Sequence, residues 1–119
     1  MPPSMFEIIC VQDQNREKFD LLSRRVGGWG LERLHFASTD VLGLMRVKRF
    51  GKDNVVVVIG EYTTFTSGQT REGYIALLLE DGVTQEQIIV LEGNESPEQI
   101  ENLVRVKIFD LLNLQEYQV

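Results

Sequence analysis

Apolar residues cluster in short runs whose composition predicts a β-sheet. The strongest run is Val55–Ile59, which contains only β-branched residues, and such side chains favour strands. Because no polar residue interrupts this run, we expect other elements to cover both faces of the strand. Residues 6–12 are rich in isoleucine and valine and form a second strand candidate.

Two segments carry the spacing of amphipathic helices. Near the C-terminus, Ser96, Pro97 and Gln99 fall at the N-cap, first and third positions of a capping box with the favoured proline. Apolar residues then recur at helical spacing as far as Leu112. A shorter helix is predicted to begin after residues 13–15, which supply N-cap side chains, and to end at residues 27–28, which are both glycine.

The remaining apolar segments are predicted to be strands joined by turns. Residues 42–50 and 54–65 flank the turn cluster 51–54. Residues 74–80 and 87–91 are expected to form a hairpin, because Asp81-Gly82 between strands is a strong turn signal. Residues 31–37 fit a helix or a strand, and we favour the strand because the glycines before it indicate a turn.

The order of these elements predicts one α+β domain over residues 1–119. It consists of a mainly antiparallel sheet of about five or six strands, a short N-terminal helix and a long C-terminal helix. An alternative is a small curled β-barrel closed by the C-terminal helix. A chain of 119 residues without a repeat or a linker fits a single domain.

The charge of the chain narrows the classes of partner. A formal net charge of −6 argues against general affinity for nucleic acid or acidic membranes. Residues 1–59 hold nine Lys and Arg against seven Asp and Glu, a net of +2, whereas residues 60–119 hold three against eleven, a net of −8. This asymmetry indicates either a solvated acidic half or a bipolar surface that favours association with itself or with a basic partner.

The single cysteine, Cys10, lies within the first predicted strand and is expected to be a small buried apolar residue. One cysteine cannot form an internal disulfide, which fits a reducing compartment. The apolar runs are too short to span a bilayer, and no basic residue precedes the first of them. We therefore expect a cytoplasmic protein that does not associate with membranes.

No motif fixes a reaction, a cofactor or a metal. His35 is the only histidine, and no H-x-x-x-H or C-x-x-C spacing exists for zinc. Gly68 and Gly73 have the spacing of a phosphate-binding loop, but Tyr74 stands where that loop requires lysine. We predict no catalytic residue, no cofactor and no metal site.

Five residues are candidates for binding. Arg46 and Lys48 would point to the same side of a strand and could hold a phosphate or an acidic segment, unless they are only a solvated strand end. Arg71 lies in the polar loop 66–73. Val106 and Phe109 fall outside the apolar stripe of the last helix, which marks either a second contact surface or a deeply embedded helix.

These features favour a non-enzymatic protein–protein interaction module, which self-associates, for example as a homodimer, or serves as a subunit of an assembly. The alternative is a small-ligand-binding domain or enzyme with a pocket between the sheet and the C-terminal helix, where Arg71 would be a polar contact. An anion or nucleic-acid contact through Arg46 and Lys48 ranks third, because the net charge opposes it.

Overall fold

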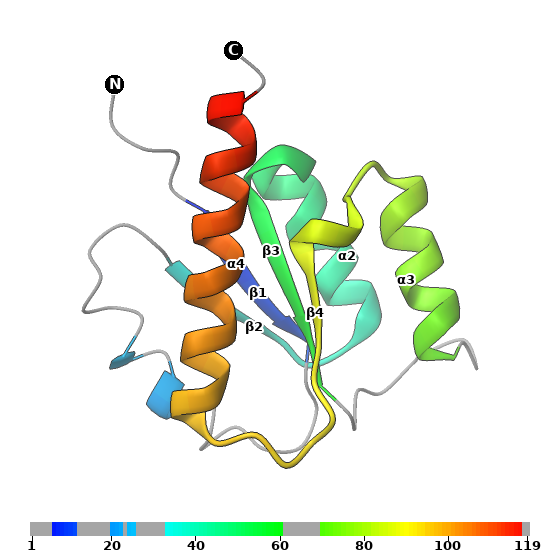
Figure 1. Ribbon diagram of the computed structural model, residues 1–119. Helices are drawn as coiled ribbons and strands as arrows, with labels where there is room; N and C mark the ends of the chain where they lie inside the picture. Colours follow the sequence, from blue (N-terminus) through cyan, green and yellow to red (C-terminus); the bar gives the residue numbers. More distant parts are fainter. Residues whose placement is uncertain (1–5, 12–19, 23, 26–32, 61–69, 118–119) are drawn as a thin grey trace.

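The computed structural model describes residues 6–11, 20–22, 24–25, 33–60 and 70–117. Its centre is a sheet of four strands, β1 (Glu7–Val11), β2 (Arg33–Ala37), β3 (Val55–Ile59) and β4 (Ile88–Val90). The strand order is β2-β1-β3-β4, and every pairing is parallel (Figure 1). The described part of the chain is therefore an α/β fold with a doubly wound order of strands.

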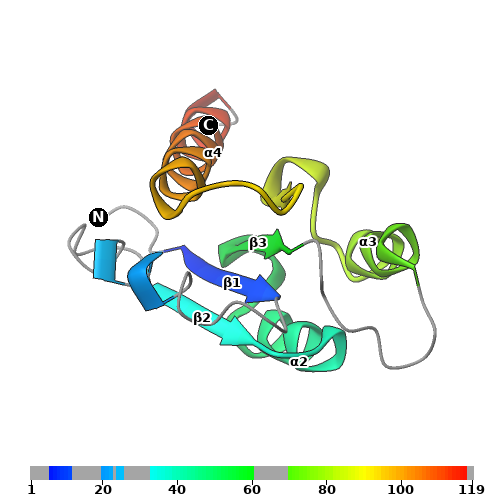
Figure 2. The same ribbon diagram turned by 90° about the horizontal axis from the view of Figure 1, so that it is seen from below.

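Helices cover both faces of the sheet. Figure 2 shows α2 (Asp40–Phe50) and α3 (Arg71–Glu80) on one side of the strands and α4 (Pro97–Tyr117) on the other. Successive residues of β3 alternate between the two layers, so Val56 packs on the α4 side and Val57 on the α2 and α3 side. All five residues of β3 are buried, which confirms that both faces of this strand are covered.

The prediction of an antiparallel sheet of five or six strands is wrong, and so is the curled barrel. Residues 42–50 and 74–80 belong to helices α2 and α3. Each helix begins after a threonine to which the strand prediction gave no role. The hydroxyl of Thr39 accepts a hydrogen bond from Leu42 N, and the hydroxyl of Thr70 accepts one from Gly73 N. These threonines are N-caps, which start a helix.

The predicted hairpin turn at residues 81–82 is the C-terminus of α3. Gly82 has φ +98° and donates its N–H to Leu79 O, while Val83 N–H reaches Leu78 O. This pair of bonds is the Schellman motif, which needs the left-handed conformation that glycine adopts without strain. The same Asp-Gly dipeptide therefore serves a helix end here and not a turn between strands.

Other predicted elements are confirmed. Strands β1 and β2 lie within the predicted segments 6–12 and 31–37, and β4 lies within 87–91. Helix α4 begins at Pro97 with the expected capping box: Gln99 N donates to Ser96 Oγ at 3.2 Å and Ser96 N donates to Gln99 Oε1 at 2.8 Å. Residues 20–22 and 24–25 are helical with Leu22 buried, but both ends of that predicted helix lie outside the described residues.

The contact between α2, α3 and β1 depends on a glycine. A Cβ atom on Gly43 would lie 2.4 Å from Tyr74 Oη and 2.8 Å from Val11 Cγ2. Both distances are shorter than van der Waals contact, so only glycine lets α2 approach the end of β1 beneath the Tyr74 ring. The buried Tyr74 ring fills the space between the two helices, and burial together with the nearby Asp40 raises the pKa of its hydroxyl.

Candidate functional site

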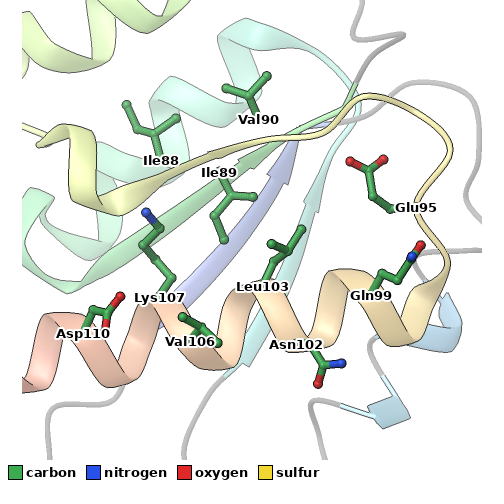
Figure 3. Close-up of a pocket in the computed structure, with 10 residues that line it drawn as sticks. All are labelled: Ile88, Ile89, Val90, Glu95, Gln99, Asn102, Leu103, Val106, Lys107 and Asp110. Atoms are coloured by element: carbon green, nitrogen blue, oxygen red, sulfur yellow. The ribbon is translucent and has the colours of Figure 1, made fainter.

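A groove of about 670 Å³ lies between β4 and α4. Its apolar wall joins the edge strand to the helix and consists of Ile88, Ile89, Val90, Leu103 and Val106. Five polar side chains complete the lining: Glu95, Gln99, Asn102, Lys107 and Asp110. Figure 3 shows Leu103 and Ile89 pointing toward each other across the groove, with Glu95 and Asp110 near its two ends.

The groove exists because α4 covers the middle of the sheet and not its edge. Ile100, Val104 and Ile108 of α4 pack in the same buried cluster as Val56 and Val58 of β3. The helical repeat then turns Leu103 and Lys107 toward β4 and turns Val106 and Phe109 away from the sheet. The flank of α4 beside β4 is consequently left without a neighbouring helix among the described residues.

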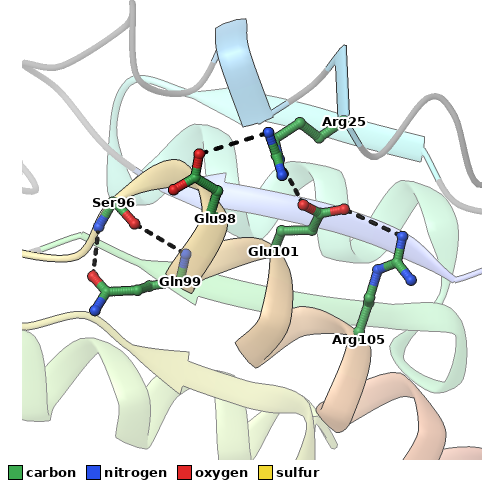
Figure 4. A network of polar contacts seen from close by, with 6 residues as sticks. All are labelled: Arg25, Ser96, Glu98, Gln99, Glu101 and Arg105. Atoms are coloured by element: carbon green, nitrogen blue, oxygen red, sulfur yellow. Dashed lines mark hydrogen bonds and ion pairs between the residues drawn. The ribbon is translucent and has the colours of Figure 1, made fainter.

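A polar network fixes the opposite flank of α4 (Figure 4). Glu101 is nearly buried and accepts hydrogen bonds from Arg25 Nε at 2.6 Å and from Arg105 Nη2 at 3.2 Å. Glu98 adds a longer ion pair with Arg25. The hydrogen bond to Glu101 raises the pKa of the Arg25 guanidinium. These contacts tie α4 to the helical residues before β2 and so help to set its rotation on the sheet.

The structure places Val106 and Phe109 one helical turn apart on the outward side of α4. Val106 is 60% exposed and also borders the groove, whereas Phe109 is 65% exposed and lies outside its lining. An aromatic side chain exposed to this extent does not contribute to the core. The two residues together form the outer face of α4, the name used for them below.

The cations predicted to act together are separated. Arg46 and Lys48 lie on helix α2, where a spacing of two residues turns side chains by about 200° to opposite sides. Lys48 borders a small hollow of about 290 Å³ with Lys52 and Asp81, and Arg46 does not line it. The prediction that Arg46 and Lys48 point to the same side assumed a strand. It does not hold for a helix, so the two cations do not form one site.

Arg71 has a structural contact in the first turn of α3. Its Nη1 donates to the carbonyl oxygen of Leu91 at 3.3 Å, which links α3 to the end of β4. The side chain is half-buried and does not line the groove beside α4. The predicted role of Arg71 as a polar contact in a pocket under the last helix therefore has no counterpart in this geometry.

The residues with catalytic chemistry lie apart from the groove. His35 Nε2 and Glu7 Oε2 are 2.5 Å apart, and the His35 ring lies against Phe50, with centroids 4.4 Å apart and the ring planes tilted by 33°. Cys10 is fully buried, and burial raises the pKa of its thiol, so the thiolate needed for nucleophilic attack is disfavoured. Within the described residues, no three His, Cys, Asp or Glu side chains gather as metal ligands.

Parallel α/β sheets often bind ligands beyond the carboxyl ends of the strands, where the strand order reverses. Here that point lies between β1 and β3. The segments that follow these strands, residues 12–19 and 61–69, lie outside the described residues, and the second of them contains the first half of the predicted polar loop 66–73. Among the helices that the structure describes, none has the length and apolarity needed to cross a membrane.

Sequence reasoning missed the strand side of the groove. Ile88, Val90 and Leu103 were assigned to a hairpin and to the buried stripe of the last helix. Val90 and Leu103 are exposed because β4 is the last strand in the order, and no local pattern encodes that position. The brevity of the apolar run at residues 88–91, followed at once by Glu92, is the only sequence signal of an edge strand.

Comparison with models of known protein families, with curated proteins and with solved structures finds no match for this chain.

Proposed function

We propose that this chain is a non-enzymatic protein–protein interaction module that self-associates as a homodimer through the outer face of α4. The observation that carries the proposal is the exposure of Val106 and Phe109 on a helix whose opposite side packs in the core through Ile100, Val104 and Ile108. Aromatic side chains such as that of Phe109 are enriched in the core of protein interfaces.

The surroundings of this face suit a second copy of the chain. Arg105 flanks it on one side and Asp110 on the other, so the charges beside the apolar pair balance and two such faces do not repel each other. A two-fold axis near the middle of the pair would place two α4 helices antiparallel, with Val106 and Phe109 of one copy over the same pair of the other. Helix α4 has 21 residues, about 30 Å of contact length.

The test is the oligomeric state of the purified chain, measured by sedimentation velocity over a range of concentrations. We expect a species of twice the 13.6 kDa chain mass that dissociates on dilution. The double variant Val106→Asp with Phe109→Asp should be monomeric, with at least a hundredfold loss of affinity, because it buries carboxylates at the centre of the interface.

The matched control is Met45→Asp, which puts a carboxylate on an equally exposed apolar position of α2, on the other side of the sheet. This variant should dimerise as the unmodified chain does. A chain that stays monomeric at the highest concentration, or a dimer that survives both carboxylates, would contradict the proposal.

A small-ligand-binding domain is the second candidate, and the volume of the groove favours it. About 670 Å³ falls within the range of ligand pockets, and the lining combines an apolar wall with Lys107. A thermal-shift screen against lipophilic carboxylates tests this candidate, because a saturating ligand raises the melting temperature. Leu103→Trp should fill the groove and abolish any such shift.

We also propose a reducing compartment, the cytoplasm, as the location of the module. The support is the one cysteine of the chain, which is fully buried and has no second cysteine to pair with.

A further inference from the structure

The second surface beside α4 is the open edge of the sheet. Strand β4 is last in the strand order and pairs only with β3 among the described residues. Helix α4 follows β4 and lies on the face of the sheet opposite α2 and α3, so it does not lie alongside the open edge. The described elements therefore leave the hydrogen-bonding groups of this edge uncovered.

The direction of the edge groups follows from the β3 pairing. Leu91 N donates to Ile59 O at 2.9 Å, so the backbone groups of Leu91 and Ile89 point toward β3. Backbone groups alternate along a strand, which turns the N–H and C=O of Val90 and the C=O of Ile88 outward. The N–H of Ile88 is already bonded to Gln85 O. Val90, which is 40% exposed, thus supplies the central donor of the edge.

Carboxylates surround this edge. Glu86 and Glu92 are exposed and lie two residues before and two residues after β4. Glu95 and Asp110 stand near the two ends of the adjoining groove, where Lys107 is the one cation among the described lining residues (Figure 3). The edge is therefore apolar at its centre and acidic at its ends.

This charge pattern opposes pairing with a second copy. Two β4 strands paired antiparallel about Ile89 would place Glu86 of each copy opposite Glu92 of the other, and like charges directly opposite each other destabilise a strand pair. Charged residues flanking an edge are a known protection against self-pairing. The same carboxylates attract a strand whose flanks are basic.

We propose that the β4 edge binds an extended segment of another protein as an added strand, and that this segment has an apolar centre with Lys or Arg on both flanks. The segment bonds to Val90 and Ile88 through its backbone. One of its apolar side chains enters the groove between Ile89 and Leu103, and its cations meet Glu86 and Glu92. The edge shares only Val106, at the border of the groove, with the outer face of α4. The charge and backbone variants below do not change that face, so either proposal can fail alone.

The test uses three labelled peptides and fluorescence anisotropy. The first is Lys-Lys-Thr-Val-Ile-Val-Thr-Lys-Lys, the second replaces every Lys by Glu, and the third keeps the Lys flanks but has Pro in place of Ile. We expect the first peptide to bind at least tenfold more tightly than the other two. Its binding should protect the amide of Val90 from hydrogen exchange.

Charge variants separate recognition at the edge from general attraction to an acidic protein. Glu92→Lys should lower the affinity for the first peptide at least fivefold. Asp20→Lys makes an equal charge change on an exposed residue of the helical segment before β2, and it should change that affinity less than twofold. The double variant Glu86→Lys with Glu92→Lys should prefer the Glu-flanked peptide. Equal effects of Glu92→Lys and Asp20→Lys, or no protection at Val90, would overturn the proposal.

A backbone variant gives a second, independent arm. Val90→Pro removes the outward N–H without removing a bond to β3, a position where edge strands tolerate proline. If this variant keeps the circular dichroism spectrum of the unmodified chain, it should no longer bind the first peptide. Retained binding by a folded Val90→Pro would show that the peptide does not add to the sheet.

Discussion

The two faces of the sheet are covered in different ways. On one face, α2 and α3 close together over β1 and β3, with Gly43 beneath the hydroxyl of Tyr74. On the other face, the long helix α4 lies over the middle of the sheet and leaves a groove along β4. The same strand, β3, supplies alternate residues to both layers, so the difference arises from the helices and not from the sheet.

This difference separates stability from interaction. The α2 and α3 face uses a small residue, Gly43, to bring two helices and a strand into close contact. The α4 face keeps a buried stripe for the core and presents its other sides to the surroundings. We infer that substitutions on the first face mainly change folding, and that surface substitutions on the second mainly change association.

The largest effect is expected from closing the space at Gly43. Gly43→Ala places a methyl group 2.4 Å from Tyr74 Oη, and overpacking of this kind should lower the free energy of unfolding by about 1–3 kcal/mol, as measured by urea denaturation. The cost should shrink in a Tyr74→Phe background, where the clashing hydroxyl is absent.

The matched control is Gly73→Ala in α3, where the nearest atom to a new Cβ, Thr70 Oγ1, is 3.4 Å away. This substitution should be neutral or stabilising, because alanine has the higher helix propensity. Equal costs for Gly43→Ala with and without the Tyr74 hydroxyl would show that the close contact is not what excludes a side chain.

An intermediate effect is expected in alkaline solution, where the stabilisation that comes from burying the Cys10 thiol is progressively lost. Burial raises the pKa of Cys10 above its ordinary value of 9.0, so the folded state holds the proton more tightly than the unfolded state. The stabilisation is complete below pH 9 and is lost as the pH rises above it. By linkage, the free energy of unfolding should fall by about 1.4 kcal/mol at one pH unit above 9.

Urea denaturation at a series of pH values from 7 to 10 measures this slope. Cys10→Ala should remove it over that interval, although its stability at neutral pH will be lower. Tyr74→Phe should change the profile only above pH 10, because the pKa of the Tyr74 hydroxyl is raised from 10.0. An unchanged slope in Cys10→Ala would refute the assignment to the thiol.

The smallest effect is expected at the start of α4. Ser96→Ala removes the hydroxyl that accepts a hydrogen bond from Gln99 N and should lower the free energy of unfolding by about 1 kcal/mol. Ser96→Thr keeps the acceptor and serves as the control. Hydrogen exchange should quicken at Gln99 in the alanine variant only. Equal exchange in both would mean that the tertiary contacts of α4, and not its cap, hold the first turn.

Local chemistry explains which elements the sequence predicts. Ser96 and Gln99 are three residues apart and act on each other, so the start of α4 is visible without any tertiary knowledge. The all-apolar run of β3 likewise implied two covering layers. Residues 42–50 are harder, because their apolar positions fit a strand and a helix equally, and Thr39 as N-cap decides between them.

The order of the strands, and with it the open edge, has no local signal. Asp81-Gly82 is compatible with a hairpin turn and with a helix end, and the choice decides whether the neighbouring strands are antiparallel or parallel. Val106 and Phe109 could be singled out because helical spacing alone excludes them from the buried stripe. The contribution of Val90 and Ile88 to the groove depends on contacts with distant residues and could not be predicted.

The all-parallel pairing also determines how the chain must fold. Glu7 aligns with Arg33 and with Val55, and Val57 aligns with Ile88. Each strand pair therefore joins residues that are tens of positions apart, and the described residues contain no hairpin that could start the sheet. Loop closure must precede every ladder of hydrogen bonds, which slows folding relative to a meander of the same size. During synthesis, β1 emerges first but has to wait for β2 and β3, so its apolar residues depend on late-arriving segments for their burial.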